Sequence, residues 1–230
     1  MLKMETVHKV LAMLQGLLAE FMEKSYDSLT LHISAGNRKI GHVWNFSLCP
    51  ILSCINCALC MLGCYDLKAC NQYLNVRIAR CENTAMMKKD MAKTFEKIDN
   101  FLSARHVHKF FRWHVSGDIL SVEYFDHMVK IARKHPDWIF WTYTKAFIYV
   151  NSWLDNNGGK KALPKNLTVM YSKWGDKEIN NPYNMPVFWC ILPWQKAPKH
   201  MKKCPGNCDV CKANKGGCIY GKSSYIRFHK

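Results

Sequence analysis

The sequence contains few acidic residues and no long hydrophobic run. It carries 17 Asp and Glu against 33 Lys and Arg, which gives a formal net charge of +16. No apolar stretch reaches the roughly 18 residues that a membrane-spanning helix requires. A helical pattern over residues 4–24 places polar residues between its apolar ones, unlike the uninterrupted core of a secretory signal. We therefore expect a cytoplasmic protein that has no membrane partner.

Internal repeats and low-complexity tracts are also absent from the sequence. Hydrophobic residues make up 49% of the chain and aromatic residues 13%, which is enough for a core and unlike a disordered chain. A chain with such a core does not need disulfides to fold, and the cytosol is reducing. The clustered ones among the twelve cysteines are therefore expected to bind metal rather than to form disulfides.

Positive charge is concentrated near the C-terminal end. Residues 191–230 hold nine Lys and Arg but one acidic residue, Asp209, so about half of the positive excess lies there. Aromatic and basic side chains interleave in this segment: Trp194, Tyr220, Tyr225 and Phe228 with Lys196, Lys222, Arg227 and Lys230. Two interpretations stay open. Either the segment binds nucleic acid, or its charge provides solubility and neutralises an anionic metal–thiolate cluster while its aromatic residues pack against the rest of the protein.

Strand and helix patterns alternate along the middle of the chain. Strands are expected at 28–34, 42–48, 109–116, 137–144, 166–172 and 186–192, and helices at 4–24, 73–104, 122–135 and 145–156. This alternation is typical of βα units on a parallel sheet. Because these strands are too few for a closed eight-stranded barrel, we expect an α/β fold that forms a partial or distorted βα (TIM-like) barrel. Residues 1–200 would form this domain, including a Cys-rich loop at 49–64, and residues 201–230 a basic Cys-rich tail that packs on it.

The cysteines form two groups. The first group is Cys49, Cys54, Cys57, Cys60 and Cys64. Residues 54–64 repeat the C-x2-C-x2-C-x3-C spacing of bacterial ferredoxins, which favours an iron–sulfur cluster over zinc. The second group is Cys204, Cys208, Cys211 and Cys218. Its spacing suits either iron–sulfur ligation or a zinc site. Cys81 and Cys190 are expected in the core, and Cys70 stays unassigned.

Polar residues follow two of the expected strands. Arg112, His114 and Ser116 alternate to one side of the strand at 109–116. Ser116, Gly117 and Asp118 at its end form a candidate cofactor-binding segment, and the alternative is a turn that caps the next helix. The next strand ends in Thr142, Thr144 and Lys145, which form either part of the same site or an ordinary strand end.

An ordered set of motifs resembles the bacteriophage family called gene product 88. The motifs are CP at 49–50, C-x3-C-Y at 60–65, NVRIAR at 75–80, HVSGD at 114–118, FWTYTK at 140–145 and the Cys-rich tail. The resemblance spans residues 40–218, and its matched cysteines are Cys49, Cys60 and Cys64.

This family is in turn distantly similar to radical S-adenosylmethionine enzymes. That similarity implies a [4Fe–4S] cluster in the loop after the first barrel strand, with S-adenosylmethionine bound beside residues 116–118. The usual C-x3-C-x2-C spacing of those enzymes occurs here only at residues 204–211. A fourth cysteine on the open iron would block binding of the methionine moiety.

Three hypotheses follow for the function. The first is a phage-encoded iron–sulfur protein that carries one or two [4Fe–4S] clusters and binds S-adenosylmethionine if an iron is open, in the host cytoplasm, with an unidentified reaction. The second is a zinc- or cluster-stabilised module that binds nucleic acid through the basic tail. The third is a structural metal protein that binds another protein.

Overall fold

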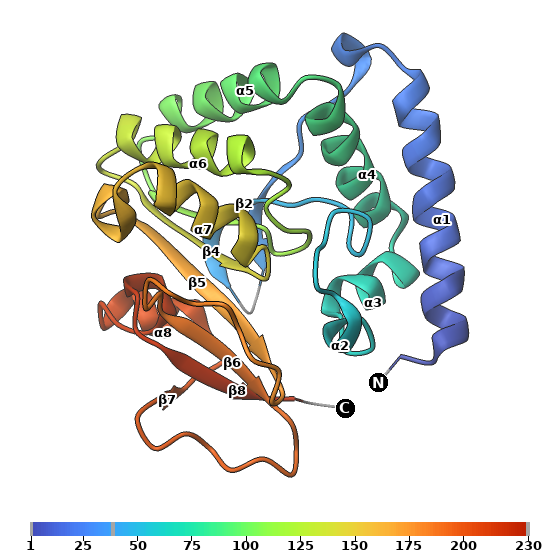
Figure 1. The fold of residues 1–230 in the computed structure, drawn as a ribbon. Helices are drawn as coiled ribbons and strands as arrows, with labels where there is room; N and C mark the ends of the chain where they lie inside the picture. The colour runs from blue at the N-terminus through green and yellow to red at the C-terminus, as the bar shows by residue number, and fades with distance from the viewer. Residues whose placement is uncertain (1, 38–39, 229–230) are drawn as a thin grey trace.

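A computed structural model describes residues 2–37 and 40–228 of the chain. Helices cover one face of a single mostly parallel sheet, and the C-terminal segment covers the other face (Figure 1). The strands are β1 (Ile33–Asn37), β2 (Gly41–Phe46), β3 (Phe110–Trp113), β4 (Ile139–Thr144), β5 (Leu167–Trp174), β6 (Val187–Ile191), β7 (Lys202–Lys203) and β8 (Ser224–Arg227). The α-helices are α1 (Met4–Glu23), α2 (Ala58–Met61), α3 (Tyr65–Gln72), α4 (Leu74–Lys89), α5 (Met91–Ser103), α6 (Val122–Lys134), α7 (Phe147–Asn156) and α8 (Cys208–Ala213).

The strand order is β1-β2-β3-β4-β5-β6-β8-β7, and only the β1–β2 pair is antiparallel. From β2 to β6 each strand pairs in parallel with the next one in the sequence, which is the order of a βα barrel. The described strands end in two free edges, β1 and β7, and do not close. The α/β class and the parallel sheet are therefore confirmed, and the sheet is an open one.

The predicted tail takes part in the same sheet through β7 and β8, and its last two residues lie outside the described part of the chain. β8 pairs in parallel with β6 on one side and with β7 on the other. The carboxyl end of β8 also reaches the Cys-rich loop, because the ring of Phe228 lies directly against Gly63. At the other end of the chain, the backbone N–H of Leu2 donates to the carbonyl of Leu62, at 2.8 Å.

We call the two sides of the sheet the helix face and the tail face. Phe111, Trp113 and Phe140 point to the helix face, where they pack with residues of α5, α6 and α7. Trp141 and Met170 point to the tail face, where they pack with residues of the C-terminal segment. A third apolar cluster joins α1, α3 and α4 to the Cys-rich loop.

The predicted helix over residues 73–104 is two helices, α4 and α5. Asp90 separates them, with φ at −154° and ψ at 94°, and its side chain accepts a hydrogen bond from the backbone of Lys93 at 2.9 Å. An Asp that caps the second helix in this way ends the first one, because a cap residue is not helical. Among the described residues, no helix combines the length and the apolar character needed to cross a membrane.

Candidate metal centre

The Cys-rich loop crosses the carboxyl ends of neighbouring parallel strands. It follows β2 directly, and the backbone N–H of Leu48 donates to the carbonyl of Ser116 beyond β3, at 2.9 Å. The side-chain amide of Asn56 donates to the carbonyl of Lys145 beyond β4, at 3.1 Å. These contacts hold the loop at the edge of the sheet where parallel α/β folds place their functional groups.

Four thiols of the first cysteine group lie near one another. The Sγ atoms of Cys57 and Cys60 are 3.6 Å apart, and the Cys57 thiol also hydrogen-bonds to Cys54. Cys64 is close enough to Cys54 and Cys60 for their charges to interact. Cys190, predicted as a core residue, comes from β6 and interacts with Cys60 in the same way.

Cys49 lies apart from this set. Its Sγ atom is 3.1 Å from that of Cys81 on α4, and its backbone N–H donates to the hydroxyl of Thr84 at 2.8 Å. Both thiols are fully buried in the cluster that also contains Cys70. Sequence reasoning assigned Cys81 to the core without this partner, because no spacing rule connects a loop cysteine with a helix more than twenty residues away.

Lys145 is the cation of the first group. Burial lowers its pKa, but the charges of Cys60, Asp118, Cys54 and Cys57 raise it to about 12. Within the described residues, no carboxylate lies within ion-pair distance of its ammonium group. The charges of the Cys60 thiol and the Asp118 carboxylate therefore act most strongly on this cation, followed by those of Cys54 and Cys57.

The Cys60 thiol is correspondingly acidic. The hydrogen bond with Cys57 lowers its pKa most, burial opposes this, and the charge and hydrogen bond of Lys145 lower it further, to about 6. Hydrogen bonds to Cys54 and Cys60, together with burial, raise the pKa of Cys57. Burial raises the pKa of Cys64 to about 12. At neutral pH this site holds a thiolate at Cys60, the form that binds metals.

The predicted cofactor segment Ser116–Asp118 packs against the Cys-rich loop and hydrogen-bonds to it. A Cβ atom on Gly117 would lie 2.6 Å from the Leu48 side chain and 2.7 Å from Ser53, and φ at Gly117 is +83°, so a glycine is required there. The backbone N–H of Asp118 donates to the carbonyl of Ser53 at 3.0 Å. Ser116 is buried.

The Asp118 carboxylate accepts three hydrogen bonds from groups inside the protein. It accepts hydrogen bonds from the Thr144 hydroxyl at 2.6 Å, the Lys145 backbone N–H at 2.8 Å and the Ile119 backbone N–H at 2.8 Å. Burial raises its pKa, and these donors together with the charge of Lys145 oppose that rise. Asp118 therefore ties the end of β3 to the end of β4.

The second cysteine group lies on the tail face. Cys211 and Cys218 are buried beside Trp141 and Met170, while Cys204 and Cys208 are partly buried. Cys208 interacts electrostatically with Cys204 and Cys211, and Cys218 with Cys208 and Cys204. The fold thus brings together all four predicted cysteines of this group.

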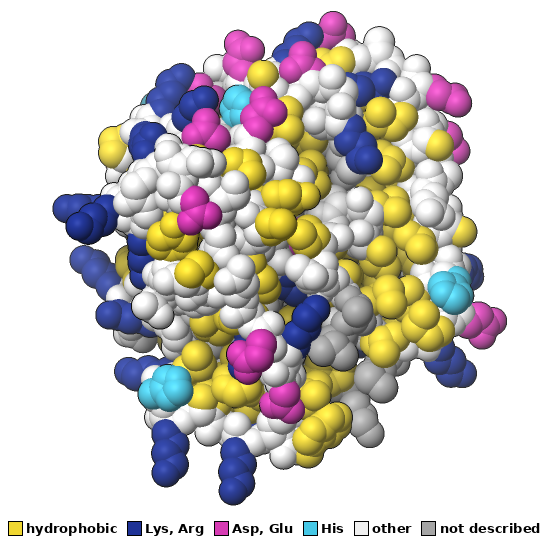
Figure 2. All heavy atoms as spheres, in the orientation of Figure 1, with side chains coloured by type: hydrophobic (Ala, Val, Ile, Leu, Met, Phe, Trp, Pro, Cys, Tyr) yellow, Lys and Arg dark blue, Asp and Glu magenta, His cyan; other side chains and the backbone are white. Residues whose placement is uncertain are grey.

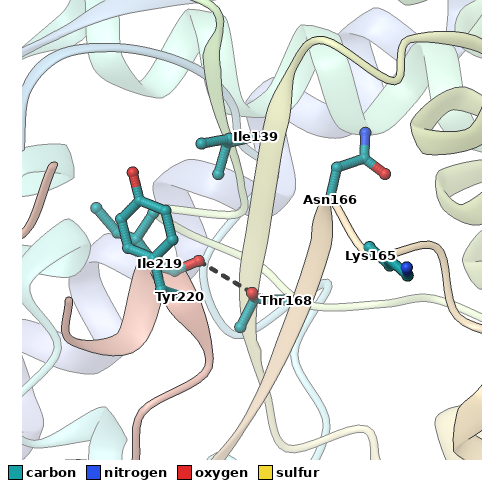
Figure 3. Close-up of a pocket in the computed structure, with 6 residues that line it drawn as sticks. All are labelled: Ile139, Lys165, Asn166, Thr168, Ile219 and Tyr220. Atoms are coloured by element: carbon teal, nitrogen blue, oxygen red, sulfur yellow. Dashed lines mark hydrogen bonds between the residues drawn. The ribbon is translucent and has the colours of Figure 1, made fainter. Parts of the chain in front are cut away.

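The space beside the first group is small. A pocket of about 40 Å³ is lined by residues that include Cys60, Lys145, Asn56 and Ser172. A larger pocket of about 310 Å³ lies at the opposite edge, at the amino ends of β4 and β5 (Figure 3). Its lining residue Asn166 donates three hydrogen bonds to backbone carbonyls.

Neither cysteine group surrounds a single point. Within residues 2–37 and 40–228, no group of three or more His, Cys, Asp and Glu side chains is arranged to hold a metal ion. A zinc site needs four ligands at about 2.0–2.3 Å from one centre. Each thiolate of a [4Fe–4S] cluster binds a different iron, so its four ligands need not converge on one point.

A family model described as Gene product 88 matches residues 22–188. The chain belongs to the gene product 88 family. The match contains the Cys-rich loop, Asp118 and Lys145, and it ends before the tail cysteines, whereas the motif resemblance extended to residue 218. No curated protein and no solved structure matches this chain.

Proposed function

We propose that the protein binds a [4Fe–4S] cluster through Cys54, Cys57, Cys60 and Cys64, on a fold distantly similar to that of radical S-adenosylmethionine enzymes. The observation that carries this proposal is the Lys145 ammonium, on which the charges of Cys60, Cys54 and Cys57 act together with that of Asp118. No carboxylate lies within ion-pair distance of it among the described residues. A desolvated cation is costly unless an anion compensates it. Cysteine thiolates on a cluster are such an anion.

We further propose that the cluster is closed, with no iron open to a small molecule. Four thiols of the loop lie near one another, so each iron of the cluster can have its own cysteine ligand. Asp118, which the radical-enzyme similarity would assign to the amino group of S-adenosylmethionine, already accepts three hydrogen bonds. A closed cluster supplies one-electron transfer rather than radical initiation.

Each residue of the site then has a defined task. Cys54, Cys57, Cys60 and Cys64 hold iron, and Lys145 offsets their negative charge. The Asn56 side-chain amide, bonded to the Lys145 carbonyl, and the Asp118 backbone N–H, bonded to the Ser53 carbonyl, fix the loop on the strand ends. A nearby cation favours the more negative, reduced state, so Lys145 also raises the reduction potential.

Metal and acid-labile sulfide measured on protein purified without oxygen test this proposal. The parent protein is expected to contain iron and sulfide in equal amounts, and Cys57→Ala/Cys60→Ala is expected to lose about four iron atoms per chain. Cys70→Ala, a buried thiol outside both groups, is the matched control and keeps them. Zinc without sulfide in the parent protein would contradict the proposal.

Electron paramagnetic resonance of the reduced protein tests whether the cluster is closed. We expect the same spectrum with and without S-adenosylmethionine, because no iron is open. A spectrum that S-adenosylmethionine shifts would overturn the closed cluster and establish an iron site that binds the methionine moiety.

A second candidate function, nucleic-acid binding, is supported by the exposure of Trp194. Its side chain is 76% exposed, the highest value among the exposed large hydrophobic residues described, and Lys196, Lys199, Lys202 and Lys203 around it are exposed too. Lys and Arg side chains project from the lower edge of Figure 2, where Figure 1 places the loop between β6 and β7. Tyr220, Tyr225 and Phe228 are partly buried, and Lys230 lies outside the described residues.

A base stacked on Trp194 is worth about 1–3 kcal/mol. Trp194→Ala is therefore expected to weaken binding of a single-stranded oligonucleotide by about tenfold or more. Lys202→Ala is expected to reduce the steepness of the salt dependence by roughly one counterion. Lys9→Ala, on the exposed side of α1, is the control and changes neither. Binding that is absent, or that does not respond to salt, would remove this candidate.

A further inference from the structure

The segment that carries the tail cysteines is held on the tail face by contacts of its other residues. The ammonium of Lys212 on α8 donates to the carbonyl of His42 at 3.2 Å, and Asp209 lies against Gly41. Both contacts are with the first residues of β2. Ile219 next to Cys218 is buried, and its carbonyl accepts from the Thr168 hydroxyl on β5 at 2.9 Å (Figure 3). The segment therefore has a fixed position across β2 to β5.

Gly217 lets the turn before Cys218 pack closely against Cys211. A Cβ atom on Gly217 would lie 2.6 Å from the Sγ atom of Cys211, and φ at Gly217 is +68°. Only glycine fits both constraints. The turn just before Cys218 thus closes directly on Cys211. Gly206 also has a positive φ, at +77°, but nothing lies within 4 Å of a Cβ atom built on it.

Arg112 stands beside this group without an anion. Its guanidinium lies 4.7 Å from the centre of the Tyr143 ring, and its Nε atom is buried with no hydrogen-bond partner. Within the described residues, no carboxylate lies within ion-pair distance of it. Its charge acts on Cys208 and Cys218. A buried N–H donor without a partner, on a partly buried cation that has no ion pair, favours an anion at this place.

Tyr143 contacts the same group. Its hydroxyl lies 2.6 Å from the Sγ atom of Cys218. A phenol O–H at this distance can donate to a thiolate. Together, Arg112 and Tyr143 offer a positive charge and a hydrogen-bond donor to sulfur on an otherwise apolar surface formed by Trp141 and Met170.

The two cysteine groups occupy different places. The first lies at the carboxyl ends of β2, β3 and β4, with Lys145, whereas α8 of the second lies against the first residues of β2. β2 runs from Gly41 to Phe46, and a strand rises about 3.3 Å per residue. These two sets of backbone anchors are therefore separated by roughly the length of the strand, about 15–20 Å.

We propose that Cys204, Cys208, Cys211 and Cys218 hold a second, separate [4Fe–4S] cluster, with Arg112 as its counter-ion. The four thiols come from one short segment, and the turn before Cys218 closes on Cys211. Cys208 and Cys218 both lie within electrostatic reach of Cys204. The proposal uses the metal chemistry of the proposed function but none of its ligands, so either site can be present without the other.

Iron counts on oxygen-free protein separate the two sites. The parent protein is expected to hold about eight iron atoms per chain, four for each cluster. Cys57→Ala/Cys60→Ala and Cys208→Ala/Cys211→Ala are each expected to hold about four. If both double variants lose all iron, one shared cluster exists and the second site is refuted while the proposed function stands. If Cys208→Ala/Cys211→Ala keeps the parental iron content, the tail binds no cluster. If the tail binds zinc, its site is not an iron–sulfur cluster.

The reduction potential provides a test that leaves all cysteines of the tail in place. In the Cys57→Ala/Cys60→Ala background, Arg112→Gln is expected to lower the midpoint potential of the remaining cluster, because the cation no longer stabilises the reduced state. Lys145→Gln, the matched control at the other site, is expected to leave that potential unchanged. An unchanged potential in Arg112→Gln, or the same shift in both variants, would overturn the assignment of Arg112 to a tail cluster.

Discussion

Asp118→Asn is expected to lower the free energy of unfolding by about 2–4 kcal/mol. One carboxylate oxygen accepts from Thr144 and Ile119, and the other accepts from the backbone N–H of Lys145. The amide nitrogen of asparagine cannot accept a hydrogen bond, so one of these donors would face another donor. Because the site is buried, water does not replace the lost bond.

Urea denaturation followed by tryptophan fluorescence measures this change. Asp137→Asn is the matched control, because Asp137 is exposed and forms an ion pair with Lys109 at the surface. Surface ion pairs contribute little to stability. A parental midpoint for Asp118→Asn would show that the bonds between the ends of β3 and β4 are dispensable.

The stability of the protein is expected to fall as the pH drops below about 6.5, because of His114. Burial and the charge of Arg112 lower the pKa of this histidine to about 3 in the folded protein. In the unfolded chain its pKa is about 6.5, so between these values the unfolded state binds more protons. The expected loss is about 1.4 kcal/mol per pH unit, or about 2 kcal/mol at pH 5.

His114→Asn is the variant that tests this dependence. Asparagine tolerates the positive φ of 59° at this position, and it does not titrate. The variant loses the bond between the His114 ring and the Tyr124 hydroxyl, at 2.8 Å, so it is less stable at pH 7. Its stability is expected to change less between pH 7 and 5 than that of the parent. Equal pH slopes in the two proteins would contradict the assignment, and His200→Asn, at an exposed position, should keep the parental slope.

The alternation of the sequence located β2 to β6, but it placed the first strand at 28–34, whereas β1 spans Ile33–Asn37, and it did not predict β7 and β8. At the end of β3 a backbone conformation interrupted the alternation. Trp113 and Arg112 lie on opposite faces of β3, as the pattern indicates. His114 was expected on the side of Arg112 but packs with Tyr124 on the helix face. The reason is its positive φ, which ends the strand at Trp113 and reverses the alternation beyond it. No residue type in the sequence signals a left-handed histidine.

The candidate site was predictable in its composition but not in its partners. Cysteine spacing found both groups, and the strand-end pattern found Lys145 and Asp118. Spacing could not show that Cys49 lies beside Cys81 while Cys57 lies beside Cys60. Tyr143 was counted as an ordinary strand residue, and its contact with Cys218 depends on a segment about 75 residues away. Contacts between distant segments are set by tertiary packing, which local patterns do not encode.

The contacts of Leu2 with Leu62 and of Phe228 with Gly63 couple the Cys-rich loop to local unfolding at both chain ends. Chain ends open more often than the core, at a small fraction of the global unfolding free energy. Each such opening removes one support from the loop and exposes its thiols to solvent and oxidants. Hydrogen exchange in residues 54–64 should therefore follow exchange at the two ends more closely than exchange in β3 and β4. Protection of the thiols from solvent and oxidants then depends on how stably both ends of the chain are folded.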